Sequence, residues 1–165
     1  MASINRFSFI FLAAIALSGV SVSAQEAPSG KHDLQLSPQL MELLRAEMRA
    51  LLSDVQLLPA GIATADWRSV ADTSAQISAS YILEQKLTAA QREELSNSLP
   101  EHFKRLDSNF HLEAKKLEAA AANHDAQLSA FHYYRLIEAC TVCHTTYAES
   151  TFPGFAPATK SSHDH

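Results

Sequence analysis

Apolar side chains recur at three- and four-residue steps along most of the chain, a spacing that predicts helices. The first run starts after Ser37-Pro38, an N-cap followed by proline at the first helical position. It ends at Pro59-Ala60-Gly61, and a second run follows Thr64. The positions expected to face inward are Met41, Leu44, Met48, Leu51, Val55 and Leu58 on the first helix, and Trp67, Val70, Ser74, Ile77 and Tyr81 on the second.

Two more helical runs fill the second half of the chain. One carries Phe103, Leu106, Phe110, Ala114, Leu117 and Ala121 and ends near Asn123; the other is capped by Asp125 and continues to about Glu149. Between the second and third runs, Thr88 and Gln91 have capping-box spacing and predict a short crossover helix over 88–99. No segment keeps a two-residue period, so we expect an all-α domain. Its short connections favour an antiparallel up-and-down four-helix bundle.

The ends of the chain have a different pattern. Arg6, the apolar stretch 7–17 and the small residues Val22-Ser23-Ala24 predict a signal peptide over 1–24, cleaved after Ala24. That apolar stretch is shorter than the roughly 20 residues that span a bilayer, so we expect no membrane span in the mature protein. We expect a flexible leader over 25–36, the helical domain over 37–154 and a flexible tail over 155–165.

Charge limits the kinds of partner. The chain has 13 Lys and Arg against 18 Asp and Glu, and residues 1–24 contain one of the basic residues and none of the acidic ones. The mature balance is therefore 12 against 18, or −6, which argues against nucleic acid. An acidic surface instead favours a protein partner with a basic patch, bound more weakly as salt rises.

The chain has only two cysteines, and both lie in Cys140-Thr141-Val142-Cys143-His144. C-x-x-C-H is the attachment pattern of c-type haem. A dithiol redox site is the first alternative, but the βαβ context of thioredoxin-like proteins is absent from the sequence. A zinc site completed by the tail segment Ser162-His163-Asp164-His165 is the second, and its ligands would be crowded on one helical turn.

Helical spacing suits haem attachment. At about 100° per residue, the side chains of Cys140, Cys143 and His144 fall within an arc of roughly 100° and project from one face. The two thiols can then form thioethers to one haem c, and the imidazole of His144 can serve as its axial iron ligand. Bacteria attach such haem outside the cytoplasm, so the motif and the export signal together predict a periplasmic protein.

These features resemble the cytochrome c′ class, in which the haem motif lies on the last helix of an exported four-helix domain. The resemblance rests on Cys140, Cys143, His144 and the aromatic Tyr147 three positions later. It implies that Tyr147 lies at the haem and that the first helix supplies the residue on the distal side of the iron. In some members this residue is apolar, and in others it is methionine.

Methionine is available at two positions of that first helix, Met41 and Met48. We expect Met48 to be the sixth ligand, because it lies near the middle of the helix. The resemblance also implies an arginine that pairs with a haem propionate, and Arg45 is the candidate, although its interval to Met48 is three residues rather than the usual four. Histidine and methionine ligation predicts a single-electron carrier with a redox protein as partner, and not an enzyme.

The alternative is a five-coordinate haem protein that binds nitric oxide or carbon monoxide, with Leu44 or Leu51 over the iron. Gas-binding members often carry a basic residue after the motif aromatic, whereas this chain has Ala148 and then Glu149. Homodimers are frequent in the class, so a second copy of the chain stays an open partner.

The remaining histidines of the domain have simpler interpretations. We expect Asp107 and His111 to form a solvated pair, four residues apart on one helix. His132 shares its helix with His144, so it cannot easily reach the other side of the iron. His102 and His124 lie at helix ends, where contact with solvent is usual.

Overall fold

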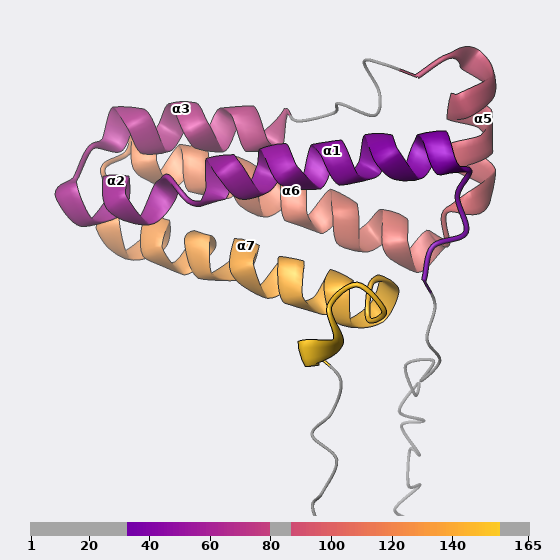
Figure 1. Cartoon of the computed structure of the whole chain (residues 1–165). Coiled ribbons are helices and arrows are strands. Elements are labelled where there is room, and N and C mark those ends of the chain that lie inside the picture. The colour runs from indigo at the N-terminus through magenta and orange to yellow at the C-terminus, as the bar shows by residue number, and fades with distance from the viewer. Residues whose placement is uncertain (1–32, 80–86, 156–165) are drawn as a thin grey trace, which may run out of the picture. The chain divides into compact units, whose positions relative to one another are not determined.

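The computed structural model describes residues 33–79 and 87–155, all within the unit Lys31–His165 (Figure 1). This part of the chain is helical and contains no strand, which confirms the all-α prediction. The proposed signal peptide, most of the leader, Tyr81 and nearly all of the tail lie outside the described residues. The elements are α1 (Pro38–Val55), α2 (Leu58–Thr64), α3 (Trp67–Ser78), α5 (Ala89–Ser98), α6 (Glu101–Ala122), α7 (Ala126–Tyr147) and the 3₁₀ turn η1 (Pro153–Phe155).

Side-chain caps fix where several helices begin. The Ser37 hydroxyl accepts a hydrogen bond from the Leu40 amide, and the Asp125 carboxylate accepts one from the Leu128 amide. Thr88 and Gln91 form both halves of a capping box at the start of α5. The three predicted caps, Ser37, Thr88 and Asp125, are confirmed.

The predicted end of the first helix is wrong. The α1 helix ends at Val55, and Pro59 lies in the first turn of α2, where its missing N–H is not needed. Gly61 then allows α2 and α3 to approach closely, because a Cβ atom there would lie 2.7 Å from Cγ2 of Val70. The short helix α2 therefore continues where the sequence pattern indicated a stop.

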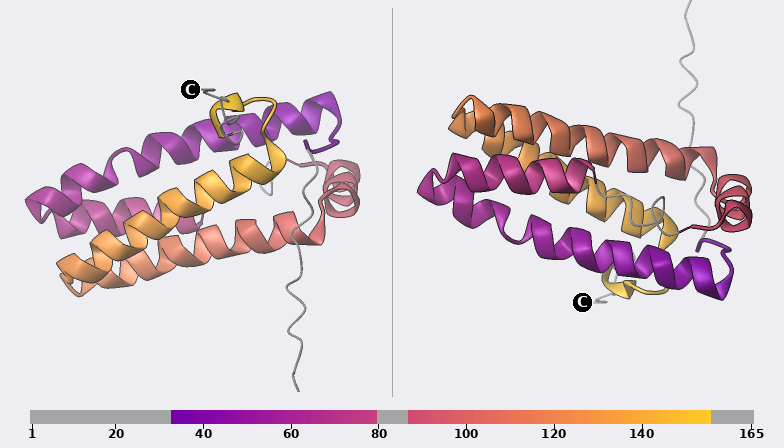
Figure 2. Two further views of the ribbon diagram at one scale, coloured as in Figure 1. Left: turned by 90° about the horizontal axis from the view of Figure 1, so that it is seen from below. Right: turned by 90° about the horizontal axis from the view of Figure 1, so that it is seen from above.

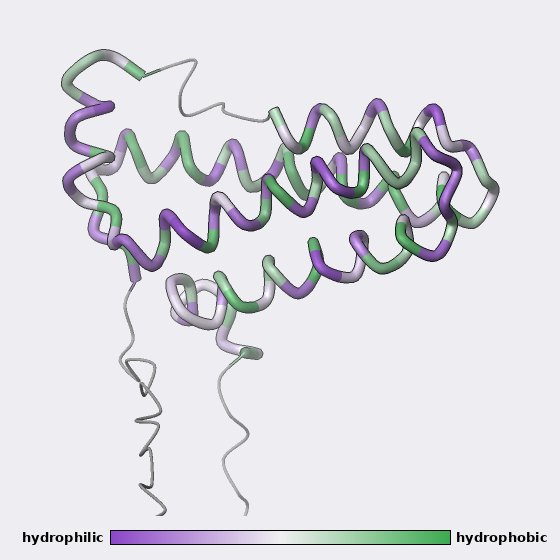
Figure 3. Tube along the Cα trace, turned by 180° about the vertical axis from the view of Figure 1, so that it is seen from behind, coloured by the Kyte–Doolittle hydropathy of each residue, from purple (hydrophilic) through white to green (hydrophobic). Residues whose placement is uncertain are grey.

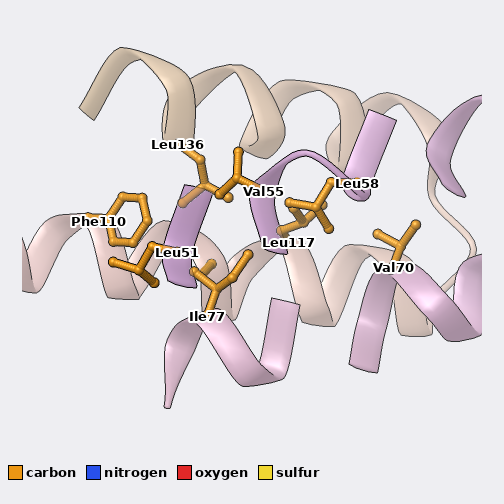
Figure 4. Packing of buried hydrophobic residues seen from close by; sticks show 10 residues of the cluster. Leu51, Val55, Leu58, Val70, Ile77, Phe110, Leu117 and Leu136 are labelled. Atoms are coloured by element: carbon orange, nitrogen blue, oxygen red, sulfur yellow. The ribbon is translucent and has the colours of Figure 1, made fainter. Parts of the chain in front are cut away.

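The core cluster lies around the C-terminal half of α1. The α3 helix packs along α6, and α6 packs along α7, while α2 contacts both α3 and α7 (Figures 1 and 2). Figure 4 shows Leu136 of α7 beside Val55 of α1, with Ile77 and Phe110 nearby. The cluster consists of Leu51, Val55, Leu58, Val70, Ile77, Phe110, Ala114, Leu117, Ala121 and Leu136.

The helices that meet in this core differ in length. The α3 helix has 12 residues, or about 18 Å, whereas α6 and α7 have 22 residues each, or about 33 Å. Figure 1 shows that the C-terminal part of α7, which carries Cys140 to Tyr147, extends past the end of α3. Within residues 33–79 and 87–155, no helix has the length and apolar character that a bilayer crossing requires.

The inward stripe of α1 differs from the predicted one. Leu40 and Glu47 are buried, whereas Met48 is 37% exposed and Met41 is only partly buried. Positions 40 and 47 lie about 100° around the helix from positions 41 and 48. Apolar residues cover more than half of the circumference of α1, so periodicity alone did not locate the centre of the buried stripe.

Candidate functional site

The two cysteines lie near the C-terminal end of α7, in its last three turns. Both are unbridged and partly buried, and Cys140 packs against the core cluster. Burial raises the pKa of the Cys140 thiol and raises that of the Cys143 thiol to about 11, with a smaller contribution from the negative charge of Asp107. Both side chains are therefore protonated thiols near neutral pH, unlike the thiolates of dithiol redox sites.

His144 follows on the flank of the same helix and is half-buried. Its ring stacks on Phe152, with centroids 4.4 Å apart and planes 20° apart, and Phe155 lies 6.3 Å away. This face contact leaves both nitrogens at the ring edge, and neither has a hydrogen-bond partner among the described residues. Burial lowers the pKa of His144, so the imidazole is neutral at pH 7, as a metal ligand must be.

Tyr147 anchors the end of the motif segment to α6. Its side chain is 8% exposed, its hydroxyl lies 3.0 Å from Nδ1 of His102, and its ring packs edge-on against Phe103 at 5.3 Å. Burial raises the pKa of Tyr147, so the hydroxyl keeps its proton and can donate to the His102 nitrogen. The sequence placed Tyr147 at the site but did not identify these two partners.

The residues proposed on α1 lie at the surface of that helix. Arg45 is exposed and forms no ion pair with any described residue, whereas Arg49 pairs with Glu42 at 2.9 Å. Met48 lies on the flank of α1, outside the core cluster. Among the described elements, α1 packs against α2 and α3 and has few contacts with α7, the helix that carries His144.

The prediction that Asp107 and His111 form a solvated pair is wrong in one respect. The pair exists, with Nε2 of His111 3.7 Å from Oδ1 of Asp107, but His111 is only 6% exposed. Its Nδ1 donates to the Ile77 carbonyl at 3.0 Å. Burial alone would lower the pKa of His111, but Asp107, the Ile77 carbonyl and the charge of Glu47 outweigh it and raise the pKa.

Sequence reasoning missed this group, in which Glu47 and His111 are buried and Asp107 is partly exposed. The one feature of the sequence that could have indicated this group is a glutamate on an otherwise apolar helix face. Glu47 lies seven residues after Leu40 and four before Leu51, so all three share that face. Phe152 was also missed, because the predicted last helix ended near Glu149 and no role was assigned to the residues directly after it. Its stacking on His144 depends on a chain reversal that periodicity does not report.

His132 lies away from the motif and links α7 to α6. Its Nδ1 is 2.8 Å from Oε2 of Glu113, whose other carboxylate oxygen accepts from Lys116 at 2.7 Å. His124, at the turn between those helices, is exposed and stacks on Trp67 at 6.3 Å. We therefore assign both histidines to packing between helices.

The donor set at the end of α7 fits a covalently held haem. Cys140 and Cys143 offer two free thiols, and His144 offers a neutral imidazole without a hydrogen bond in the described structure. No cluster of three or more His, Cys, Asp or Glu side chains is arranged around a common metal position in the described ranges. The tail residues of the zinc alternative lie outside those ranges. No known family model, curated protein or solved structure matches the chain.

Proposed function

We propose that this chain is a periplasmic monohaem c-type cytochrome, similar to the cytochrome c′ class, that carries single electrons. The observation that carries the proposal is the arrangement of Cys140, Cys143 and His144 on one helical segment, with both thiols free and no hydrogen bond from the imidazole to any described residue. Residues 1–24 direct export in this proposal, and α1, α3, α6 and α7 make up an antiparallel up-and-down four-helix bundle.

Haem iron supplies the one-electron chemistry when it is bound. Cys140 and Cys143 would hold the group covalently, and His144 would supply a nitrogen ligand to its iron. Phe152 supports one face of the imidazole, and Tyr147, held by His102, fixes the last turn of α7. Histidine ligation with partial burial sets the potential. Arg45 can pair with a haem propionate, because it forms no ion pair with a described Asp or Glu side chain.

Met48 supplies the sixth ligand in this proposal. Its side chain is on an apolar flank of α1 and is 37% exposed, so it can turn without leaving a hole in the core cluster. The same exposure supports a second candidate function, five-coordinate iron that binds nitric oxide or carbon monoxide. In that case Met48 stays at the surface and Leu44 or Leu51 lies over the iron.

Visible absorption distinguishes the two functions. We expect the wild-type protein to be low-spin with a methionine-to-iron charge-transfer band when oxidised, and not to bind carbon monoxide when reduced. Met48→Leu should lose the band and gain carbon monoxide binding, while the matched variant Met41→Leu keeps the wild-type spectrum. A high-spin wild type that binds carbon monoxide at once and does not respond to Met48→Leu would establish the gas-binding alternative.

A further inference from the structure

The chain folds back directly after α7 and returns an aromatic ring to the candidate axial histidine. Figure 3 shows this segment curling at the end of α7 before it reaches η1, which packs against α7. The amides of Thr151 and Phe152 both donate to the Ala148 carbonyl, at 3.0 and 2.9 Å. The Phe155 amide donates to the Phe152 carbonyl at 3.1 Å. Because these bonds close within the segment itself, the position of Phe152 against His144 is set by local structure.

The contact between Phe152 and His144 is a face-to-face stack. Their ring centroids are 4.4 Å apart and their planes differ by 20°, whereas the ring of Phe155 lies 6.3 Å from each and is inclined to both. The second side-chain torsion of histidine is intrinsically broad, so the backbone of α7 does not fix the plane of the imidazole. A phenyl ring lying flat on one face does fix that plane, because rotation of the imidazole would push its edge into the phenyl ring.

The polar surroundings of His144 differ from those of most metal-binding histidines. Such a histidine normally donates from its second ring nitrogen to a carboxylate or a carbonyl, which orients the ring and makes it a stronger electron donor. Here neither nitrogen bonds a described residue, and no Lys, Arg, Asp or Glu occurs between Glu138 and Glu149. Phe152 takes over the orienting role of that partner, but a phenyl ring offers no acceptor in the plane of the imidazole.

We propose that Phe152 is the positioning residue of the His144 imidazole, holding its plane by stacking while leaving it a neutral and weakly donating ligand. Since this role exists only if His144 binds haem iron, it rests on the proposed function. A histidine that donates no strong hydrogen bond stabilises oxidised iron less than a hydrogen-bonded histidine does. The stack therefore favours the reduced form of the site, and Phe152 acts through His144 without being a ligand itself.

Electron paramagnetic resonance of the oxidised protein tests the orientation of the ring. The g-values depend on how the plane of the axial imidazole lies, and the full chain is expressed with its export signal so that it carries haem. We expect wild type and Phe152→Tyr, which keeps the stacking face, to give one set of g-values. Phe152→Leu is apolar but cannot stack, so its g-values should spread as the imidazole takes several orientations.

The reduction potential tests how strongly the ligand donates. Phe152→Gln offers a carbonyl acceptor without a charge, to which the imidazole can donate. We expect the equilibrium constant for reduction to fall about tenfold in Phe152→Gln, a shift of about 59 mV for a one-electron couple, while Phe152→Tyr keeps the wild-type potential. The control Phe131→Gln makes the same change at an exposed phenylalanine in the first half of α7 and should leave both readouts unchanged.

The possible outcomes separate the stack from the haem. A haem-containing Phe152→Leu protein with wild-type g-values, or a Phe152→Gln protein with the wild-type potential, would overturn the role of Phe152 and leave the proposed cytochrome intact. A wild-type chain that carries no haem would overturn both. Phe152 is 40% exposed and lies outside the core cluster, so its variants should keep the wild-type helix content, which circular dichroism checks.

Discussion

His111 is a titratable side chain held inside a helical core. It is 6% exposed, donates from Nδ1 to the Ile77 carbonyl, and presents Nε2 to the Asp107 carboxylate. The raised pKa means that the folded protein binds a proton at this site more tightly than the unfolded chain does. The resulting stabilisation is complete below the ordinary pKa of 6.5 and is lost as pH rises through the higher folded pKa.

Replacing His111 should therefore lower the free energy of unfolding by an amount that depends on pH. We expect His111→Gln to lower the free energy of unfolding by about 2 kcal/mol at pH 6, because the neutral amide cannot replace the protonated imidazole that Asp107 and Glu47 stabilise. The difference from wild type should shrink as pH rises past the folded pKa of the histidine. Chemical denaturation at several pH values measures it, with the exposed neighbour variant Leu112→Gln as control. A difference that stays constant with pH would show that protonation of His111 does not contribute.

At the scale of elements, the motif segment of α7 depends on α6 for its position. The hydroxyl of Tyr147 and Nδ1 of His102 are 3.0 Å apart, and Phe103 packs on the same tyrosine ring. These contacts fix the last turn of α7 three residues after His144. They link the helix that carries the proposed haem-attachment residues to a helix that has none of the proposed haem ligands.

A double-mutant cycle measures this link. We expect Tyr147→Phe and His102→Gln each to destabilise the protein, with a coupling of about 1 kcal/mol between them, since each removes the same hydrogen bond. Tyr134→Phe is the matched control, because Tyr134 is 57% exposed on the same helix and should show no coupling to His102. Additive effects of Tyr147→Phe and His102→Gln would contradict the proposed role of the bond.

Local signals predicted the helices better than they predicted the contacts between them. The caps at Ser37, Thr88 and Asp125 were readable because each is completed within three residues. The break between α1 and α2 could not be predicted in the same way, because proline can either end a helix or begin one. The burial of Glu47 in place of Met48 depends on how α1 rotates against its neighbours, and its broad apolar surface left that rotation open.

The same distinction applies to the candidate site. Cys140, Cys143 and His144 were predicted from five consecutive residues, and a single helix presents them. The partners that support them come from elsewhere: His102 and Phe103 from α6, and Phe152 from the segment beyond α7. No pattern along the sequence relates these residues to the motif, so only the folded chain identifies them.

At the scale of the whole described molecule, packing and candidate chemistry are concentrated at different places along the helices. The apolar cluster surrounds the C-terminal half of α1 and the middle of α7, and Cys140 packs against its edge. The motif lies farther along α7, past the end of α3. We infer that the cluster supports folding, and that the extended part of α7 is where a large apolar cofactor completes the interior.

The central claim is that Cys140 and Cys143 hold one haem covalently, and intact mass spectrometry under denaturing conditions tests it most directly. The full chain is expressed with its export signal in a bacterium that attaches haem in the periplasm. We predict that wild type and the control Thr141→Ala carry the mass of one haem, which Cys140→Ala/Cys143→Ala lacks. A wild-type chain with no added mass, with its two cysteines joined in a disulfide or still free, would contradict the account.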